Sequence, residues 1–398
     1  MPLSPDEPQM GRRCKAGISQ ETCLEKRCPM RQPETFEERD LGRQSVFPAD
    51  RSFKKFEESV FFVQQPFTGE TIMKLFISFL AVVSVFLATF CQAGHGDYGS
   101  QSKTAIVLAS FGTSEPTALM SILNIKEKVE KTFPETPVAL TFTSNIIRNV
   151  WQERSNDKAF QEAHPEIPAE IKNVKGIIAT IGDLQNQGYN TIIVQPTHMV
   201  HGEQFLDLKS YIDALASIKT VKAKYRPFHV LTLGRPASGT IGITHDYNVD
   251  LQRLAQAMAP DVALARQNNS VLVYMAHGNE HMANGIYPQF QEVMRKMYPD
   301  VKTYVGAVEG FPEFDLVLSE LLRDEATKIT LKPFMIVAGD HAINDMAGDE
   351  EDAWEVMLSQ KGFEVIPVLQ GIGSNDAVAE IFVDHIRDAA ADHGVTLH

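Results

Sequence analysis

Cysteine is scarce in this sequence and is absent from every position after Cys91. The 398 residues include four cysteines, which are Cys14, Cys23, Cys28 and Cys91. The chain beyond Cys91 therefore has no disulfide, no thiolate metal ligand and no cysteine nucleophile. The first three cysteines are not spaced like the ligands of a common zinc site.

Basic residues are fewer than acidic ones, and several sequence motifs of nucleotide-binding and hydrolytic enzymes are absent. Lys and Arg number 37 against 51 Asp and Glu, so the formal net charge is −14. This balance argues against nucleic acid or an anionic membrane as a partner. The sequence has no Walker lysine and no G-x-G-x-x-G, so nucleotide binding is unsupported. It also has no nucleophile elbow, which argues against a Ser/His/Asp hydrolase.

An apolar run long enough to span a bilayer is missing from the front of the chain. Residues 75–90 form a mostly apolar segment of 16 residues, shorter than the ~20 that a transmembrane helix needs. Lys74 precedes the run, and Cys91 and Ala93 follow it as small residues before Gly94. The pattern predicts a signal peptide over 73–93, cleavage after Ala93, export to the periplasm and no stable membrane insertion afterwards. An uncleaved anchor is the alternative.

The predicted signal peptide begins at Met73, so 72 residues precede a segment that is expected at the N-terminus. Export machinery reads an N-terminus, so Met73 is the expected start and residues 1–72 the expected non-native, disordered extension. Their mixture of charged, polar and Pro residues shows no sustained helical or strand period. A genuine cytoplasmic N-terminal arm is the alternative.

Strands and helices alternate along the rest of the chain. This alternation predicts an α/β fold of two similar Rossmann-like lobes, 94–236 and 237–398, with parallel sheets that flank a cleft. The expected strands are 104–109, 138–142, 191–195, 229–233, 270–276, 303–307, 328–331 and 364–368. The expected helices are 115–132, one capped by Ser144, 167–187, 204–217, 281–297, 313–322, 350–360 and 377–391.

The two lobes resemble each other in sequence, which indicates an internal duplication. The segment 103–112 aligns with 269–278, and 191–202 aligns with 329–339. Gly112 and Gly278 coincide, so we expect both to serve the turn that follows a strand. Phe111 aligns with His277, however, and Gln204 aligns with His341. The histidines are therefore additions in the second lobe rather than requirements of the fold.

Three side chains follow strands of the second lobe and could meet at one edge of its sheet. They are His277, Glu309 and His341, and two imidazoles with one carboxylate suit a divalent first-row metal and leave coordination positions open. Asp340 or Asp345 could orient His341. The alternative is that each is a solvated polar residue at a strand end. Residues 277–281 also spell H-x-x-E-H, but that peptidase motif requires a helix.

Two further groups could contact a ligand in the first lobe. Ser110, Phe111, Gly112 and Thr113 form a small-residue loop whose backbone N–H groups could cradle carboxylates. His198 and His201 follow the strand at 191–195 and could bind a ligand or ligate haem iron. As an alternative, both histidines could lie on the rim of the protein without a ligand.

Five stretches together resemble the CbiK-type anaerobic cobalt chelatases, the sirohydrochlorin cobaltochelatases. They are residues 106–114, 195–198, 275–281, 308–312 and 339–342, and the likeness extends over roughly 103–395. The resemblance implies a class II chelatase fold and ATP-independent insertion of Co²⁺ into the tetrapyrrole sirohydrochlorin, with release of two protons. It places the metal ligands on His277, Glu309 and His341, with His277 as the base.

Export is unexpected for such an enzyme, because cobalamin and sirohaem synthesis are cytoplasmic. An exported copy could insert Fe²⁺, bind haem, or act as a non-catalytic periplasmic carrier of metal or tetrapyrrole. A homo-oligomer is a further alternative. Each of these alternatives makes a distinct experimental prediction.

Overall fold

The computed structural model describes residues 102–242 and 244–398, which belong to one compact unit, Ala88–His398. The predicted extension 1–72 and signal peptide 73–93 lie outside the described residues. In the part of the chain that the structure describes, no helix combines the length and apolar character needed to cross a membrane.

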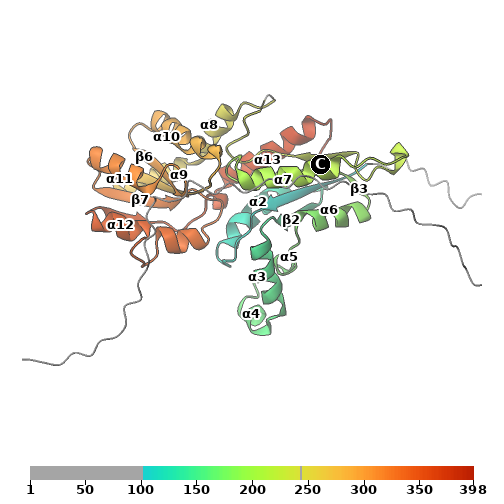
Figure 1. Ribbon diagram of the computed structural model, residues 1–398, viewed down its shortest axis with the longest axis horizontal. Coiled ribbons are helices and arrows are strands. Elements are labelled where there is room, and N and C mark those ends of the chain that lie inside the picture. Colours follow the sequence, from blue (N-terminus) through green and yellow to red (C-terminus); the bar gives the residue numbers. More distant parts are fainter. Residues whose placement is uncertain (1–101, 243) are drawn as a thin grey trace, which may run out of the picture. The chain divides into compact units, whose positions relative to one another are not determined.

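The first lobe contains a parallel four-stranded sheet in the order β2-β1-β3-β4 (Figure 1). Its strands are β1 (Lys103–Ser110), β2 (Val138–Phe142), β3 (Tyr189–Pro196) and β4 (Val230–Leu233). Its helices are α2 (Leu119–Thr132), α3 (Asn145–Asn156), α4 (Lys158–Ala163), α5 (Ala169–Lys172), α6 (Ile177–Asn186) and α7 (Glu203–Ala216), followed by the short η1 (Ala223–Tyr225).

The second lobe repeats this arrangement with the parallel order β6-β5-β7-β8. Its strands are β5 (Val271–Gly278), β6 (Thr303–Glu309), β7 (Lys328–Pro333) and β8 (Glu364–Pro367). Its helices are α8 (Tyr247–Ala257), α9 (Ala259–Asn268), α10 (Ile286–Met297), α11 (Phe314–Arg323) and α12 (Trp354–Gln360), with short turns η2 (Met282–Gly285), η3 (Ala342–Met346) and η4 (Ile372–Ser374) before α13 (Asp376–Ala391). The repeated strand order confirms the predicted duplicated α/β fold.

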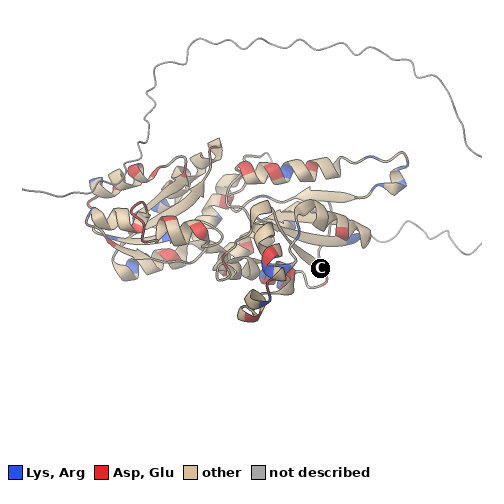
Figure 2. Cartoon of the chain, turned by 60° about the horizontal axis from the view of Figure 1, so that its bottom comes forward, with Lys and Arg blue, Asp and Glu red and all other residues tan. Residues whose placement is uncertain are grey.

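Alternation along the strands divides the buried side chains into three cores. Ile106 and Leu108 of β1 share one core with Leu272 and Tyr274 of β5, while Val107 faces a core confined to the first lobe. The other face of β5 packs into a third core with α11 and α12. Successive residues of a strand point to opposite faces, so one sequence serves two cores. Figure 2 shows the charged residues mainly on the helices, with the strands largely free of them.

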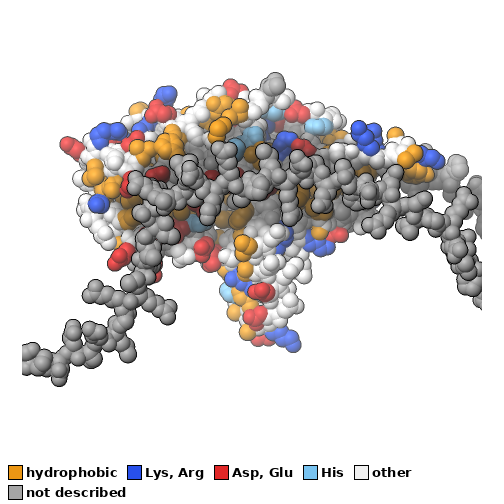
Figure 3. Space-filling model, viewed as in Figure 1, with side chains coloured by type: hydrophobic (Ala, Val, Ile, Leu, Met, Phe, Trp, Pro, Cys, Tyr) orange, Lys and Arg blue, Asp and Glu red, His pale blue; other side chains and the backbone are white. Residues whose placement is uncertain are grey.

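The final helix returns to the first lobe. Helix α13 follows the second sheet in sequence but packs against α2 and β3. The lobe boundary between residues 236 and 237 stays a prediction. Helix α13 belongs to the second half of the sequence but packs on the first lobe. Helices α3 and α4 project from the first lobe (Figure 1), and side chains of both charges cover the projection (Figure 3).

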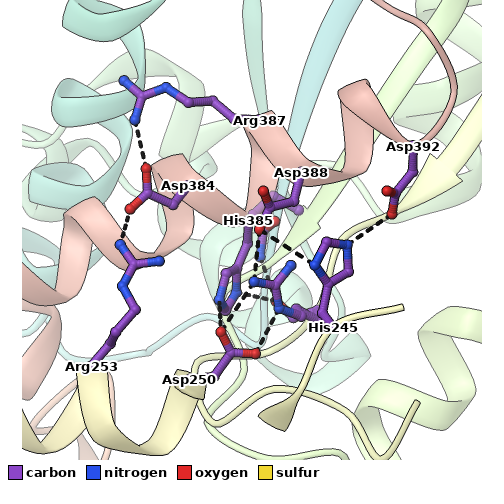
Figure 4. Close-up of polar contacts among 10 residues, drawn as sticks. His245, Asp250, Arg253, Asp384, His385, Arg387, Asp388 and Asp392 are labelled. Atoms are coloured by element: carbon purple, nitrogen blue, oxygen red, sulfur yellow. Dashed lines mark hydrogen bonds and ion pairs between the residues drawn. The ribbon is translucent and has the colours of Figure 1, made fainter. Parts of the chain in front are cut away.

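A buried ionic network joins the segment between the sheets to α8 and α13 (Figure 4). Arg235 donates from Nε to Oδ2 of Asp250 at 2.7 Å and from Nη2 to Oδ2 of Asp388 at 2.8 Å. His385 lies 3.2 Å from Asp250. Burial by itself would raise the pKa of Asp250, but hydrogen bonds from His385 and Arg235 outweigh it and lower that pKa to about 2. The network therefore stabilises the junction with an ionised carboxylate.

Two helical predictions differ from the structure. The helix expected over 167–187 is interrupted, because Lys175 forms a bridge with Thr141 and its carbonyl accepts hydrogen bonds from β2. Helices α8 and α9 lie where no element was predicted. The Ser144 cap is confirmed, since its Oγ accepts from the backbone N–H of Ile147 at 3.3 Å.

Candidate active site

The second sheet brings the three predicted metal-binding side chains to its carboxyl edge. His277 is the penultimate residue of β5, Glu309 ends β6, and His341 lies in the turn between β7 and η3. Strand β5 pairs with both β6 and β7, and Gly278 is in register with Glu309. Parallel pairing therefore places side chains 32 residues apart beside one another.

The three side chains approach each other without forming a closed metal cage. Nδ1 of His277 lies 3.9 Å from Oε2 of Glu309, and the His277 and His341 rings are 4.6 Å apart at 89°. Across residues 102–242 and 244–398, no group of three or more His, Cys, Asp or Glu is positioned to hold a metal ion. The metal-site assignment stays a prediction.

Hydrogen bonds define which nitrogen of each imidazole is free. Nδ1 of His277 lies 2.8 Å from the carbonyl of Gly278, and Nδ1 of His341 lies 2.5 Å from Oδ2 of Asp345. Both partners are acceptors, so Nδ1 carries the proton in each neutral ring. The Nε2 lone pairs are then available to a cation. Of the two acids predicted to orient His341, Asp345 contacts it, whereas Asp340 accepts from Asn344.

The glycine after His277 is required by the close approach of two strands. Gly278 has φ +82°, and a Cβ there would lie 1.8 Å from the carbonyl oxygen of Glu309. Gly112 has φ +98° at the equivalent turn of the first lobe. Both values belong to the left-handed region that favours glycine. The predicted role of the two glycines is confirmed.

A pocket of ≈ 930 Å³ lies where the strand ends of both lobes face each other. His277 and Glu309 line it from the second lobe, but His341 does not. Its other walls include Thr197, His198, Met199, Val200, Gly202, Glu203, Gln204, Phe205, Asn279, Tyr287, Phe334, Met335, Ile336 and Val337. The mixture of apolar walls and a few polar groups is typical of a site for a small molecule.

The predicted loop of the first lobe lies only partly in this pocket. Ser110, Phe111 and Gly112 line it, and Phe111 is 40% exposed. Oγ of Ser110 accepts from the N–H of Gly112 at 3.3 Å, so that N–H is already engaged. Thr113 is buried, and its carbonyl accepts from Nε1 of Trp151 at 2.8 Å. Thr113 therefore supports the loop.

The two histidines of the first lobe are separated by the structure. His198 lines the main pocket and is 7% exposed, and neither ring nitrogen has a hydrogen-bond partner among the described residues. Burial lowers its pKa to about 4. His201 lines a different pocket beside His281 and packs on Phe205. Burial, with the neighbouring His281 and Lys209, lowers the pKa of His201 as well.

Comparison with known proteins identifies the family. Residues 104–391 match the family described as cobalt chelatase (CbiK). The chain belongs to this family. The predicted resemblance is therefore confirmed over nearly all the described residues.

Relatives of this chelatase carry consistent names. It is 29% identical over 289 residues to the sirohydrochlorin cobaltochelatase of Salmonella typhimurium, which covers 72% of this chain and 96% of that one. It is 26% identical over 290 residues to sirohydrochlorin cobaltochelatase CbiKC of Nitratidesulfovibrio vulgaris, at 73% and 92% coverage. Among solved structures, SirB from Bacillus subtilis with Fe³⁺ is 16% identical, with a TM-score of 0.47 and coverage of 73% and 98%.

Sequence reasoning missed one residue that organises the chelatase site. Asn284 is buried, and its Nδ2 donates to the carbonyl of Asn279 at 2.7 Å and to that of Glu309 at 3.2 Å. It thereby links the loop after β5 to the end of β6. No motif marks Asn284, because its role depends on two carbonyls that only the fold brings together.

Proposed function

We propose that this chelatase inserts Co²⁺ into sirohydrochlorin in the pocket between the strand ends, with release of two protons. Family membership supports the reaction class. The observation that carries the proposal is the pair of adjacent imidazoles, His277 and His341, whose Nδ1 atoms are engaged by Gly278 and Asp345, with the Glu309 carboxylate 3.9 Å from Nδ1 of His277. Such a set can hold a divalent cation and leave positions open for pyrrole nitrogens.

His277 is the proposed base. It lies in the pocket wall and is 35% exposed as a side chain, so it can reach both the metal and the tetrapyrrole. An imidazole near neutral pH can bind a metal or accept a proton. As the metal passes to the ring nitrogens, Nε2 of His277 becomes free to accept a pyrrole proton. The neighbouring Glu309 carboxylate stabilises the resulting imidazolium.

The apolar walls are proposed to bind the faces of the macrocycle. Phe111 and Met199 of the first lobe and Phe334 and Ile336 of the second line the same pocket. A flat ring held between two rigid lobes can be kept out of plane, so that nitrogen lone pairs point towards the metal. Ser110 and Gly112 complete this wall.

The test is to mix purified protein with sirohydrochlorin and Co²⁺, or with Fe²⁺, and to follow the visible spectrum. We expect insertion to be faster than in the protein-free control. Binding of either substrate without acceleration would instead identify a non-catalytic carrier and reject the enzyme. Parallel reactions measure the metal preference, which donor chemistry alone does not determine.

We further propose that the protein acts in the periplasm as a mature chain that begins at Gly94. The support is the segment at 73–93, which has the charged, apolar and small-residue regions of a signal peptide. Mass spectrometry of the N-terminus from fractionated cells tests this location. Recovery of a chain that begins at Met1 in the cytoplasm would reject it. Gel filtration of the mature protein tests the predicted homo-oligomer.

For haem, His201 is the better placed of the two predicted ligands. It lies in an open pocket with Ile241, Met282 and Ile286, whereas both ring nitrogens of His198 are buried. An imidazole amid apolar side chains suits haem iron and its ring. A Soret band after haem addition, lost in His201→Ala, would support this assignment, and an unchanged spectrum would reject it.

A further inference from the structure

The main pocket offers no cationic side chain to an acidic substrate. None of the described residues that line it is Lys or Arg, and Glu203 adds a negative charge. Sirohydrochlorin carries acetate and propionate side chains around its ring, all of them ionised near neutral pH. Burying such groups without a cation or hydrogen-bond donors is costly. The pocket has polar donors such as Ser110, Gln204 and Asn279, but a positively charged partner for the carboxylates must lie beyond it.

A second pocket of ≈ 1050 Å³ adjoins the first and shares Phe111 and Gln204 with it. It lies against α3, α6 and α7 in the first lobe. Among the described residues that line it, Arg148 is the one Lys or Arg. A group that extends from the first pocket past Phe111 enters the space beside this guanidinium.

Arg148 is held in place without being neutralised. Its Nη1 donates to the carbonyls of Phe142 and, at 2.9 Å, Thr143, and its Nη2 donates to Oδ1 of Asn145. Within residues 102–242 and 244–398, no carboxylate forms an ion pair with it. Burial lowers the pKa of Arg148, yet a guanidinium retains its charge in proteins. The pocket thus holds an oriented, uncompensated cation.

The backbone around Arg148 strengthens the positive potential. A Cβ on Gly176 would lie 3.0 Å from Cζ of Arg148, so glycine allows the guanidinium to approach the start of α6. Helix α6 has no side-chain cap at Gly176, and residues 177–179 line the pocket. The partial positive charge of the helix start adds to that of Arg148. Asp207, also in the lining, opposes it.

We propose that Arg148 binds a peripheral carboxylate of the tetrapyrrole and selects for acidic macrocycles. This inference rests on the proposed function, because it assigns a role in the same substrate complex. The ring lies in the first pocket, and one acetate or propionate passes Phe111 to reach the guanidinium. Planar, directed donors suit such a carboxylate better than a lysine does.

The test compares Arg148→Gln, Arg148→Lys and Asp207→Asn with the parent. We expect Arg148→Gln to raise KM for sirohydrochlorin about fivefold with kcat within about twofold, since a partly exposed charge pair is weak and acts on binding rather than chemistry. Arg148→Lys should recover part of the loss. Asp207→Asn should lower KM by about twofold, because it removes an opposing charge without touching the Arg148 contacts.

Lys209→Gln is the matched control, because it removes one positive charge from α7 outside both pockets. It should leave KM unchanged. An unchanged KM in both Arg148→Gln and Asp207→Asn, or an equal change in Lys209→Gln, would overturn the proposal. Thermal melts identify a variant that fails to fold, in which case Arg148→Lys and Asp207→Asn decide.

Binding of metal-free sirohydrochlorin, followed by its fluorescence, separates this proposal from the proposed reaction. A parent that binds the tetrapyrrole but does not insert metal would reject the reaction and still allow Arg148 to be tested through Kd. A parent that inserts metal, with Kd unaffected by Arg148→Gln, would reject the carboxylate site alone.

Discussion

The two lobes present the same strand end with different chemistry. In the first, β1 ends at Ser110 before Phe111 and Gly112, and in the second, β5 ends with His277 and Gly278. Both glycines have positive φ and allow the same turn. The residue before each glycine points to the same pocket, where one copy offers an aromatic wall and the other an imidazole. Duplication repeated the strand end and its turn, and on the proposed assignment the side chain before the glycine makes the second lobe the reactive one.

The largest difference between the lobes should appear in catalysis. His277→Ala removes the proposed base and a metal donor, so kcat/KM should fall on the order of 1,000-fold. Phe111→Ala removes only an apolar contact and should cost less than about tenfold. Initial rates of the spectral change measure both. Equal losses in the two variants would show that the lobes contribute alike, contrary to the proposal.

Replacing the glycine should destabilise the second lobe more than the first. Gly278→Ala places a Cβ against backbone at the end of β6, and we expect a loss of about 3 kcal/mol or more in the free energy of unfolding. Gly112→Ala meets the buried Phe142 ring at 2.8 Å, a side chain rather than backbone, and should lose less, about 1–2 kcal/mol. Urea unfolding provides the comparison. A smaller loss for Gly278→Ala than for Gly112→Ala would contradict the conclusion that backbone at the end of β6 leaves no room for a Cβ at position 278.

The buried His198 of the first lobe should make the stability of the fold sensitive to acid. Because the folded pKa of His198 is about 4 and the unfolded value is near 6.5, its neutral form stabilises the fold fully above pH 6.5. That stability falls as pH drops from 6.5 to 4, by about 3 kcal/mol in total.

The matched variant is His198→Phe, which cannot titrate. Between pH 7 and pH 4, the free energy of unfolding of the parent should fall by about 3 kcal/mol more than that of His198→Phe. Parallel pH profiles for the parent and His198→Phe would show that His198 is not buried in its neutral form.

Among these comparisons between the lobes, the smallest effect is expected at Asp345, the acid that contacts His341. Asp345→Asn keeps the size of the side chain but weakens the hold on Nδ1, so metal affinity should fall about tenfold. Asp340→Asn is the control, because Asp340 does not contact the ring. Calorimetric titration with Co²⁺ measures both. Equal affinities for the two variants would remove Asp345 from the site.

Much of the fold was predictable because its signals are local. Runs of β-branched residues that end in a turn predicted each strand, and repeated glycines indicated two equivalent lobes. The break in the helix predicted over 167–187 was not predictable, because the pairing of Lys175 with Thr141 joins residues 34 apart. Helix α8 packs against α13, and α9 packs against β5. Both were missed although Asp246 caps α8 and the buried Leu251, Leu254, Ala255 and Met258 recur at helical spacing.

The candidate site divides in the same way. Sequence alone determined that imidazoles and a carboxylate follow strands of the second lobe, and that a glycine recurs at the same turn in both lobes, whereas the structure showed why Gly278 cannot carry a Cβ. Tertiary structure decided which of these side chains approach each other, which nitrogen each imidazole leaves free, and that His198 and His201 occupy different pockets. It also decided that Arg148 stands beside the main pocket. The reason is that neighbouring residues determine a local backbone, whereas distances, burial and tautomers depend on strands paired across the sheet.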